Sequence, residues 1–421
     1  MGILNRLEAS MANNSTIYYD VSTPFPSLLN HTEAAGDNGT PPSSVWDIYK
    51  QHCPEATMID KYLTPYVYVV GFPGNILALV IWLQKRMRNS SGYYLAALAM
   101  ADLVFLLLQI VYELNEKWGI RCLDVEFVCE FYPIIFLTSQ YLSPLLVLAF
   151  TVERYISICH PFSREKFCTT KRAKVVIVCL FIFSFFINGI QGYFWHYDSG
   201  GRCSLRADVV RNNEASFWSI WTWCVEALVF FLVPILILVF NILVIAEAKR
   251  LSKFEKNHLQ SRTHKNSATT VMLLAVSFYQ IFTTLPVTIV VTLYYSFPMG
   301  DPENLNPPDS IWQRHFDYVY IKTIIEEVGL THYACNFYIY CITGKVFRQE
   351  FKRMWRSLVC LKMKSALPNW TTEYTSLRGS LRNNPKNLTV RMSNGHANGH
   401  STTSTTNDVE PPVVEPTETT L

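Results

Sequence analysis

Residues 127–158 read FVCEFYPIIFLTSQYLSPLLVLAFTVERYISI, and this run indicates the fold class. Its charged residues lie near its two ends, at Glu130, Glu153 and Arg154, and the residues between them are mostly apolar. A membrane-spanning helix needs about 20 mostly apolar residues to cross roughly 30 Å of hydrocarbon. The run exceeds that minimum, so we expect a helix that is tilted or that extends beyond the bilayer.

Six further apolar runs accompany this one, at residues 62–83, 93–114, 173–195, 217–246, 267–297 and 318–342. Half of the 421 residues are hydrophobic and 16% are charged, whereas soluble domains carry roughly 25% charged residues. Several runs contain a proline, which packed membrane helices tolerate as a kink. The sequence therefore predicts an all-α membrane protein, a seven-transmembrane helix bundle.

Basic residues are concentrated in one set of connections, at 85–88, 164–174, 249–265 and 345–356. The opposite set is mixed or acidic. Because cytoplasmic loops carry the excess of Lys and Arg, we expect an extracellular amino terminus and a plasma-membrane location. The amino-terminal tail also contains the glycosylation sequons of Asn13, Asn14, Asn30 and Asn38.

These features divide the chain into four parts. Residues 1–60 are predicted to form a glycosylated extracellular tail and residues 61–344 the bundle. In residues 345–360, Phe347, Phe351 and Trp355 recur at helical spacing between basic residues, which predicts an amphipathic helix on the inner membrane surface. Cys360 is a candidate for palmitoylation, with an unmodified cysteine as the alternative. Residues 361–421 are polar and predicted to be a disordered cytoplasmic tail.

Short motifs occur in a fixed order along the spans. They are Gly74-Asn75, Leu98-Ala99-Met100-Ala101-Asp102, Glu153-Arg154-Tyr155, Pro234, Pro286 and Asn336-Phe337-Tyr338-Ile339-Tyr340. Together they resemble the rhodopsin-like (class A) G-protein-coupled receptors. Residues 153–160 and 167–174 are further similar to invertebrate neuropeptide receptors of the FMRFamide and thyrotropin-releasing-hormone type. The resemblance implies a receptor that binds an extracellular peptide and activates heterotrimeric G proteins.

The resemblance also implies roles for particular residues. Activation and G-protein coupling are expected at Glu153, Arg154, Tyr155, Asn336 and Tyr340. An internal polar cluster is expected from Asn75, Asp102, Ser143 and Asn336, which in many relatives binds sodium. His332 stands where the family usually has Asn, so a hydrogen-bonded cluster without an ion is the alternative.

Some family positions differ in this chain. Thr284 stands in the segment Thr283-Thr284-Leu285-Pro286 where the family has its tryptophan switch, and Phe337 replaces the proline of the seventh-helix motif. Asn266 occupies the position of the acid that usually pairs with the third-helix arginine. The resemblance therefore predicts the fold without predicting how activation proceeds.

The cysteines near connecting segments are candidates for disulfides in an oxidising space. By resemblance, Cys129 and Cys203 form the bridge that the family shares. Cys53 and Cys122 are candidates for a second bridge, although four cysteines allow three connectivities.

The ligand class is narrowed by two substitutions. Leu330 stands at the family's retinal lysine and Phe136 at the aspartate that binds amines, which disfavours both ligands. The candidate pocket residues are Gln109, Glu113, Tyr132, Phe136, Gln140, Glu226, Thr284, Tyr294, Lys322 and Glu326. Carboxylates within a membrane need a partner. A basic or amidated peptide would supply one for Glu226, Glu326 and Glu327, and internal pairing with Lys322 is the alternative.

Other functions and partners are compatible with parts of the sequence. A receptor for a non-peptide small molecule remains open, as does a transporter or ion pump with Asp102, Glu226 and Glu326 as a proton relay, although no repeat relates the two halves. No nucleophile–base or metal constellation predicts an enzyme, and a net charge of +3 does not suggest nucleic acid. Arrestin is an expected partner of the phosphorylated tail, and Thr419-Thr420-Leu421 fits a PDZ ligand.

Overall fold

The computed structural model describes residues 45–210, 216–258, 264–300 and 308–366. The predicted glycosylation sites, the tail phosphorylation sites and the carboxyl-terminal Thr419–Leu421 lie outside these residues. The chain divides into two units, Met1–Ser357 and Leu358–Leu421, and the helix bundle lies in the first.

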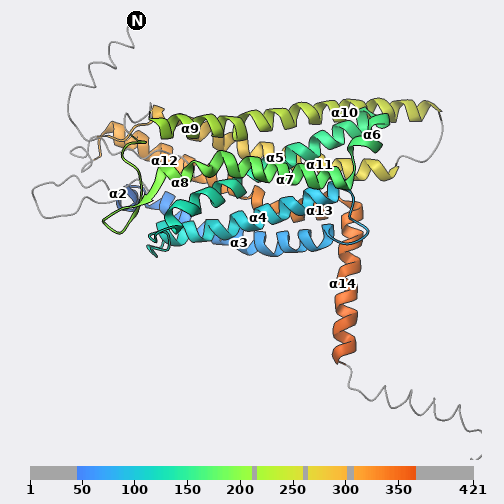
Figure 1. The fold of residues 1–421 in the computed structure, drawn as a ribbon, viewed down its shortest axis with the longest axis horizontal. Coiled ribbons are helices and arrows are strands. Elements are labelled where there is room, and N and C mark those ends of the chain that lie inside the picture. The colour runs from blue at the N-terminus through green and yellow to red at the C-terminus, as the bar shows by residue number, and fades with distance from the viewer. Residues whose placement is uncertain (1–44, 211–215, 259–263, 301–307, 367–421) are drawn as a thin grey trace, which may run out of the picture. The chain divides into compact units, whose positions relative to one another are not determined.

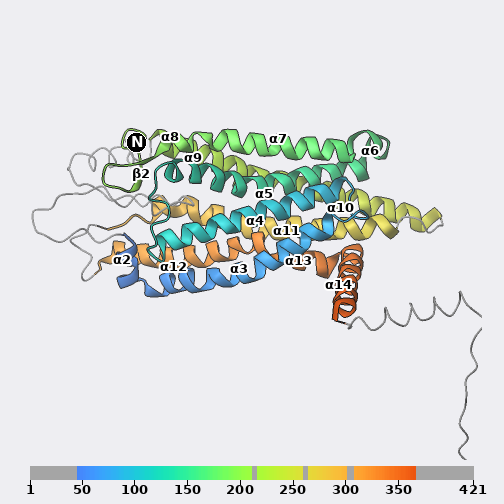
Figure 2. The ribbon, with the colours of Figure 1, turned by 60° about the horizontal axis from the view of Figure 1, so that its bottom comes forward.

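The membrane helices of this first unit lie side by side (Figure 1; Figure 2), and the described residues form seven of them. Their bounds are α3 Pro54–Trp82, α4 Ser90–Glu116, α5 Val128–Cys159, α7 Thr170–Gly189 with α8 Gln191–Phe194, α9 Phe217–Glu226 with the π-helix η2 Ala227–Leu232 and α10 Val233–His258, α11 His264–Thr292, and α12 Ser310–Leu330 with α13 His332–Thr343. This arrangement confirms the predicted bundle.

Six of these helices are long and apolar enough to cross a membrane. The α12–α13 helix is more polar, since it carries Lys322, Glu326 and Glu327. In an apolar stretch of 18 residues, 78% of the residues are buried in α5 but only 17% in α7–α8, so α5 is central and α7 peripheral. Large apolar side chains on the outside, such as Val69 and Phe186, are more than 70% exposed, as suits contact with lipid.

Shorter elements and a further helix precede, connect or follow the membrane helices along the chain. They are α2 Val45–His52, α6 Pro161–Phe167, the antiparallel strands β1 Trp195–Tyr197 and β2 Cys203–Leu205, the 3-10 helix η3 Leu293–Ser296, and α14 Lys345–Ala366. The first membrane helix begins at Pro54 instead of 62, because Pro is favoured in a helix's first turn. Residues 45–52 and 54–60, which the sequence predicts as tail, are therefore helical. The amphipathic helix continues to Ala366 instead of ending at 360.

Side chains that accept hydrogen bonds from the first turn define several helix starts. Asn89 accepts from the Gly92 N–H at 2.8 Å before α4, and Thr169 accepts from the Arg172 N–H at 3.3 Å before α7. Such caps satisfy N–H groups that have no partner within the helix.

Two prolines within the helices free carbonyl groups that other helices then use. Pro234 has no N–H for the carbonyl of Phe230, and the Thr288 hydroxyl of α11 donates to that oxygen at 2.9 Å. Pro144 likewise frees the carbonyl of Gln140, which accepts from the Tyr333 hydroxyl of α13 at 3.4 Å. The kinked backbone is thereby satisfied without water, as a membrane interior requires.

The disulfide Cys129–Cys203, with a Cα–Cα distance of 5.4 Å, joins the start of α5 to β2. The prediction of a second bridge is wrong, because Cys53 and Cys122 are both free thiols. Cys53 contacts the carbonyl of Phe316 at 3.7 Å, whereas Cys122 contacts the carbonyl of Val111 at 3.3 Å, so each thiol packs against a different helix. Burial raises the pKa of both thiols.

Replacing Cys203 with Ser should release the β1–β2 hairpin from α5 and lower delivery of the protein to the cell surface. Antibody staining of an amino-terminal tag on intact cells would measure surface delivery. The control Cys224→Ser changes an exposed free cysteine and should leave staining unchanged. Equal staining of the Cys203→Ser and wild-type proteins would contradict the structural role of this bridge.

Candidate functional site

A cavity of about 480 Å³ lies among the helices, in the half of the bundle that contains the start of α5 and the end of α11. This volume lies within the range of ordinary ligand pockets, roughly 300–1,000 Å³. Aromatic side chains of Phe105, Phe136 and Tyr333 form one wall, and they pack on each other with the Phe105 and Tyr333 ring centroids 3.9 Å apart. The cavity can therefore accept an apolar or aromatic group of a ligand beside this wall.

Acidic side chains dominate the polar part of the lining. Of the described residues that line it, Asp60, Glu113, Glu226, Glu326 and Glu327 are acidic and Lys117 is a lysine. Because acidic side chains so outnumber the lysine, the cavity favours a ligand group that donates hydrogen bonds or carries positive charge.

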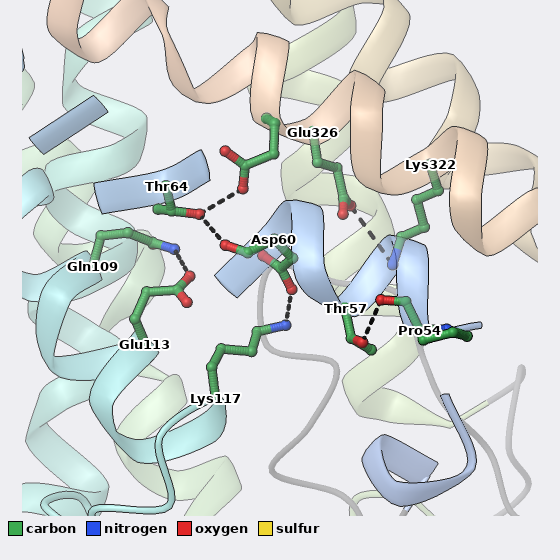
Figure 3. A network of polar contacts seen from close by, with 10 residues as sticks. Pro54, Thr57, Asp60, Thr64, Gln109, Glu113, Lys117, Lys322 and Glu326 are labelled. Carbon is green, nitrogen blue, oxygen red and sulfur yellow. Dashed lines mark hydrogen bonds and ion pairs between the residues drawn. The ribbon is translucent and has the colours of Figure 1, made fainter. Parts of the chain in front are cut away.

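Asp60 of α3 and Lys117 at the end of α4 form an ion pair at the outer edge of the cavity (Figure 3). Burial alone would lower the pKa of Lys117, but the carboxylates of Asp60 and Glu113 outweigh burial and raise it above its usual range. Glu113 in turn accepts from the Gln109 amide at 3.1 Å. This network fixes α3 against α4.

A second set of contacts involves α12. The Thr64 hydroxyl lies 2.7 Å from Glu327 Oε1, and Lys322 Nζ lies 3.6 Å from Glu326 Oε1. Among the described acidic residues that line the cavity, two have a buried carboxyl oxygen without a hydrogen-bond partner, Glu226 at Oε1 and Glu327 at Oε2. Unpaired buried acceptors are costly, so both are available for donor groups of a ligand.

Seven of the ten predicted pocket residues line the cavity, namely Gln109, Glu113, Phe136, Gln140, Glu226, Thr284 and Glu326. Tyr132 instead donates to the carbonyl of Leu108 at 2.7 Å. Tyr294 packs in an outer aromatic cluster with Tyr49, Trp312 and Phe316. Lys322 is outside the lining but pairs with Glu326.

Sequence reasoning missed Asp60 and Lys117. Both lie at helix ends, where charged residues are usually solvated, and the predicted helix start at 62 placed Asp60 in the tail. Asp60 lies four residues before Thr64, which places both on one face of a helix. This spacing is the signal that could have found Asp60.

Below the cavity, Asp102 is fully buried and forms the centre of a polar cluster. The Ser143 hydroxyl donates to one carboxylate oxygen and the Asn336 amide to the other, each at 2.8 Å. The Asn75 amide donates to the carbonyl of Tyr333 at 2.7 Å. The structure therefore brings three of the four predicted cluster residues into direct contact and places Asn75 beside the neighbouring backbone.

Near the carboxyl-terminal end of α5, Arg154 pairs with Glu153 at 3.6 Å. Glu153 also accepts from the hydroxyls of Ser90 and Ser91, which begin α4, the second at 3.1 Å. Thr151 and Ser277 are hydrogen-bonded at 3.3 Å and join α5 to α11. The remaining predicted residues lie nearby. The Tyr155 ring is tilted against that of Phe240, with centroids 5.3 Å apart, and Tyr340 packs against Trp82 and Phe347.

Comparison with known proteins gives consistent matches. The family model described as 7 transmembrane receptor (rhodopsin family) matches residues 74–325. A probable G-protein coupled receptor of Caenorhabditis elegans is 25% identical over 308 residues, 69% of this chain and 68% of that protein. The FMRFamide receptor of Drosophila melanogaster is 25% identical over 388 residues, 82% of this chain and 66% of that receptor.

The pyrokinin-1 receptor of Drosophila melanogaster is 29% identical over 184 residues, 42% of this chain and 41% of that receptor. A third or more of the FMRFamide and pyrokinin-1 receptors therefore lies outside the matched parts.

Replacing Lys117 with Met should lower the free energy of unfolding, because Asp60 loses its partner. We expect a loss of about 2–3 kcal/mol, which lies between the losses typical of exposed and of buried salt bridges. Thermal unfolding of the purified protein in detergent would measure this. The double variant Asp60→Asn/Lys117→Met should recover most of the loss.

Arg121→Met is the matched control, since it breaks an exposed pair with Asp124 at 3.9 Å at the same end of the bundle. Equal unfolding temperatures for Lys117→Met and Arg121→Met would show that the Asp60–Lys117 pair does not stabilise the helix ends.

Proposed function

Because the chain belongs to the rhodopsin family of seven-transmembrane receptors, we propose that it binds an extracellular neuropeptide and activates heterotrimeric G proteins. Members of this family are receptors and not enzymes. The peptide enters the cavity with a basic side chain, and activation alters the inner ends of α5 and α11.

The acidic lining of the cavity is the observation that carries this proposal. The buried Glu226 carboxyl has an oxygen without a partner, and a guanidinium or ammonium group is the chemistry that satisfies it. The aromatic wall of Phe105, Phe136 and Tyr333 accommodates a neighbouring apolar side chain. The names of the matched FMRFamide and pyrokinin-1 receptors support a peptide as the ligand.

The proposed orientation places the amino terminus outside the plasma membrane. It is supported by the basic connections after α3, α5 and α10. The cavity then opens toward the extracellular side, and Arg154 lies at the cytoplasmic side, where a G protein binds. Arrestin binding through a phosphorylated tail and a PDZ partner at Thr419–Leu421 belong to the same proposal.

A sodium ion is the cofactor that we propose for the polar cluster. The carboxylate of Asp102 and the hydroxyl of Ser143 are oxygen ligands of the kind that hard cations prefer, and the Oδ1 of Asn75 is buried without a partner. Asp102 and Ser143 would hold the ion, which would add positive charge beside a buried carboxylate.

Screening neuropeptides on cells that express the chain, with calcium and cAMP readouts, tests the proposed ligand class. We expect activation by peptides that contain Arg, and replacement of that Arg by uncharged citrulline should weaken the response at least tenfold. Glu226→Gln should weaken the Arg peptide but change the response to the citrulline peptide little. Activation by a non-peptide small molecule alone would favour the alternative receptor, and substrate flux without G protein would favour a transporter.

Replacing Arg154 with Ala should abolish agonist-driven nucleotide exchange on the G protein while surface expression stays near normal. A charged guanidinium at this position offers several donors to a partner's carbonyl groups, and Ala offers none. Exchange would be measured with purified receptor and G protein, with Arg164→Ala as the control on the exposed helix α6. Full exchange by Arg154→Ala would remove Arg154 from the coupling site.

A further inference from the structure

The Thr64 hydroxyl has two short oxygen contacts at the edge of the cavity. It lies 2.6 Å from the backbone carbonyl of Asp60 and 2.7 Å from Glu327 Oε1. Both distances are those of full O–H···O hydrogen bonds, and one hydrogen shared between two acceptors would give longer contacts. Since a hydroxyl has one hydrogen, it can donate to only one of the two oxygens.

The second hydrogen must come from Glu327. The Asp60 carbonyl can only accept, so Thr64 donates to it, and Glu327 Oε1 can bond to Thr64 only as an O–H donor. The surroundings favour a neutral acid. Glu327 is 7% exposed. Three carboxyl groups and one phenol face it, those of Asp60, Glu113, Glu326 and Tyr68, and Lys117 is the cation among its described neighbours.

The other oxygen of Glu327 faces no hydrogen-bond donor. Oε2 is buried and without a partner, and Glu327 lines the ligand cavity. With Oε1 protonated, Oε2 is the carbonyl oxygen of a neutral acid, so the cavity contains an acceptor whose strength changes when the proton leaves. A carboxylate attracts a cation more strongly than a neutral carboxyl group does.

We propose that Glu327 carries a proton in the ligand-free receptor and that a cationic group of the ligand replaces this proton, so that ligand binding releases a proton to the solvent. This rests on the proposed function in one respect, that the ligand enters this cavity. The O–H bond of Glu327 breaks, its proton passes to bulk water, and an N–H···O bond from the ligand cation forms on the carboxylate.

The exchange also changes the contact between α3 and α12. Once Glu327 has lost its proton, it can only accept, so the Thr64 hydroxyl rotates from the Asp60 carbonyl to Glu327. The Asp60 carbonyl keeps its helical N–H partner four residues later. The bond between Thr64 and Glu327 then joins a hydroxyl to a carboxylate and is stronger than before.

Proton exchange makes ligand binding depend on pH in a stated direction. The proton and the ligand cation compete for Glu327, so affinity falls as pH falls. The slope is at most tenfold per pH unit, since one proton is exchanged. Affinity becomes independent of pH once Glu327 is ionised in the free receptor.

Infrared spectroscopy of the purified, ligand-free receptor tests the first half of the proposal without any ligand or G protein. The wild-type minus Glu327→Gln difference spectrum should contain the carbonyl band of a protonated carboxylic acid, and Thr64→Val should shift that band. Gln retains an N–H donor for Thr64, so the variant should fold.

Glu350→Gln is the matched control, because Glu350 is also largely buried but pairs with Arg353 at 2.9 Å and should give no such band. Absence of the band from the Glu327→Gln difference, or a band that Thr64→Val leaves in place, would overturn the proposal.

The exchange step is tested with L-argininamide, a small molecule that carries a guanidinium and an amine. Its addition should remove the Glu327 band, and more argininamide should be needed at lower pH. Persistence of the band at the solubility limit, or removal with no pH dependence, would overturn the exchange. Because neither readout involves nucleotide exchange, a failure here is distinguishable from a failure of G-protein activation.

Discussion

The absence of water in a bilayer is the constraint on which the rest of this structure depends. Each backbone N–H and C=O must find its partner within the protein, and a helix does this for nearly all of them. The prolines are the exceptions. The Thr288 and Tyr333 hydroxyls donate to the carbonyls that Pro234 and Pro144 release, so the groups that repair the backbone also connect neighbouring helices.

The same constraint explains the contrast between the two polar regions of the interior. Around Asp102 each carboxylate oxygen has a donor, and the region is closed. Around the cavity, Glu226 and Glu327 each retain an oxygen without a partner. Polar groups that have hydrogen-bond partners within the protein stabilise the bundle. Buried groups without a partner can still form hydrogen bonds to a ligand, and these bonds would favour its binding.

The fold is predictable from sequence because hydropathy is a property of whole segments. The motif residues Asp102, Arg154 and Asn336 are likewise found from short patterns taken in order. The lining is harder to predict, because it depends on which face of each helix turns inward. Tyr132 and Tyr294 are expected in the pocket from their depth, yet they hydrogen-bond or pack beside it.

Asp60 and Lys117 illustrate the opposite error, since charged residues at helix ends resemble solvated connections. Their contact joins residues 57 positions apart, and no local pattern encodes such a pair. The prediction of a second disulfide failed for a similar reason. Two cysteines in outer segments satisfied the chemistry, but the helices hold each thiol against a different carbonyl.

The π-helix η2 begins directly after Glu226 and ends two residues before Pro234. A π-helix accommodates one residue more than an α-helix of the same length. Removing one residue such as Leu228, which is exposed on the outside of the bundle, would therefore leave a regular helix of the same length, and the residues on its two sides would keep their facing. If η2 instead became a regular α-helix with all its residues, the residues before it would rotate by roughly 100° relative to the residues after it. Glu226 would then turn away from the cavity although no lining residue had been substituted. The position of Glu226 in the cavity thus depends on the π-helical turn itself, a dependence that a comparison of pocket residues alone would not reveal.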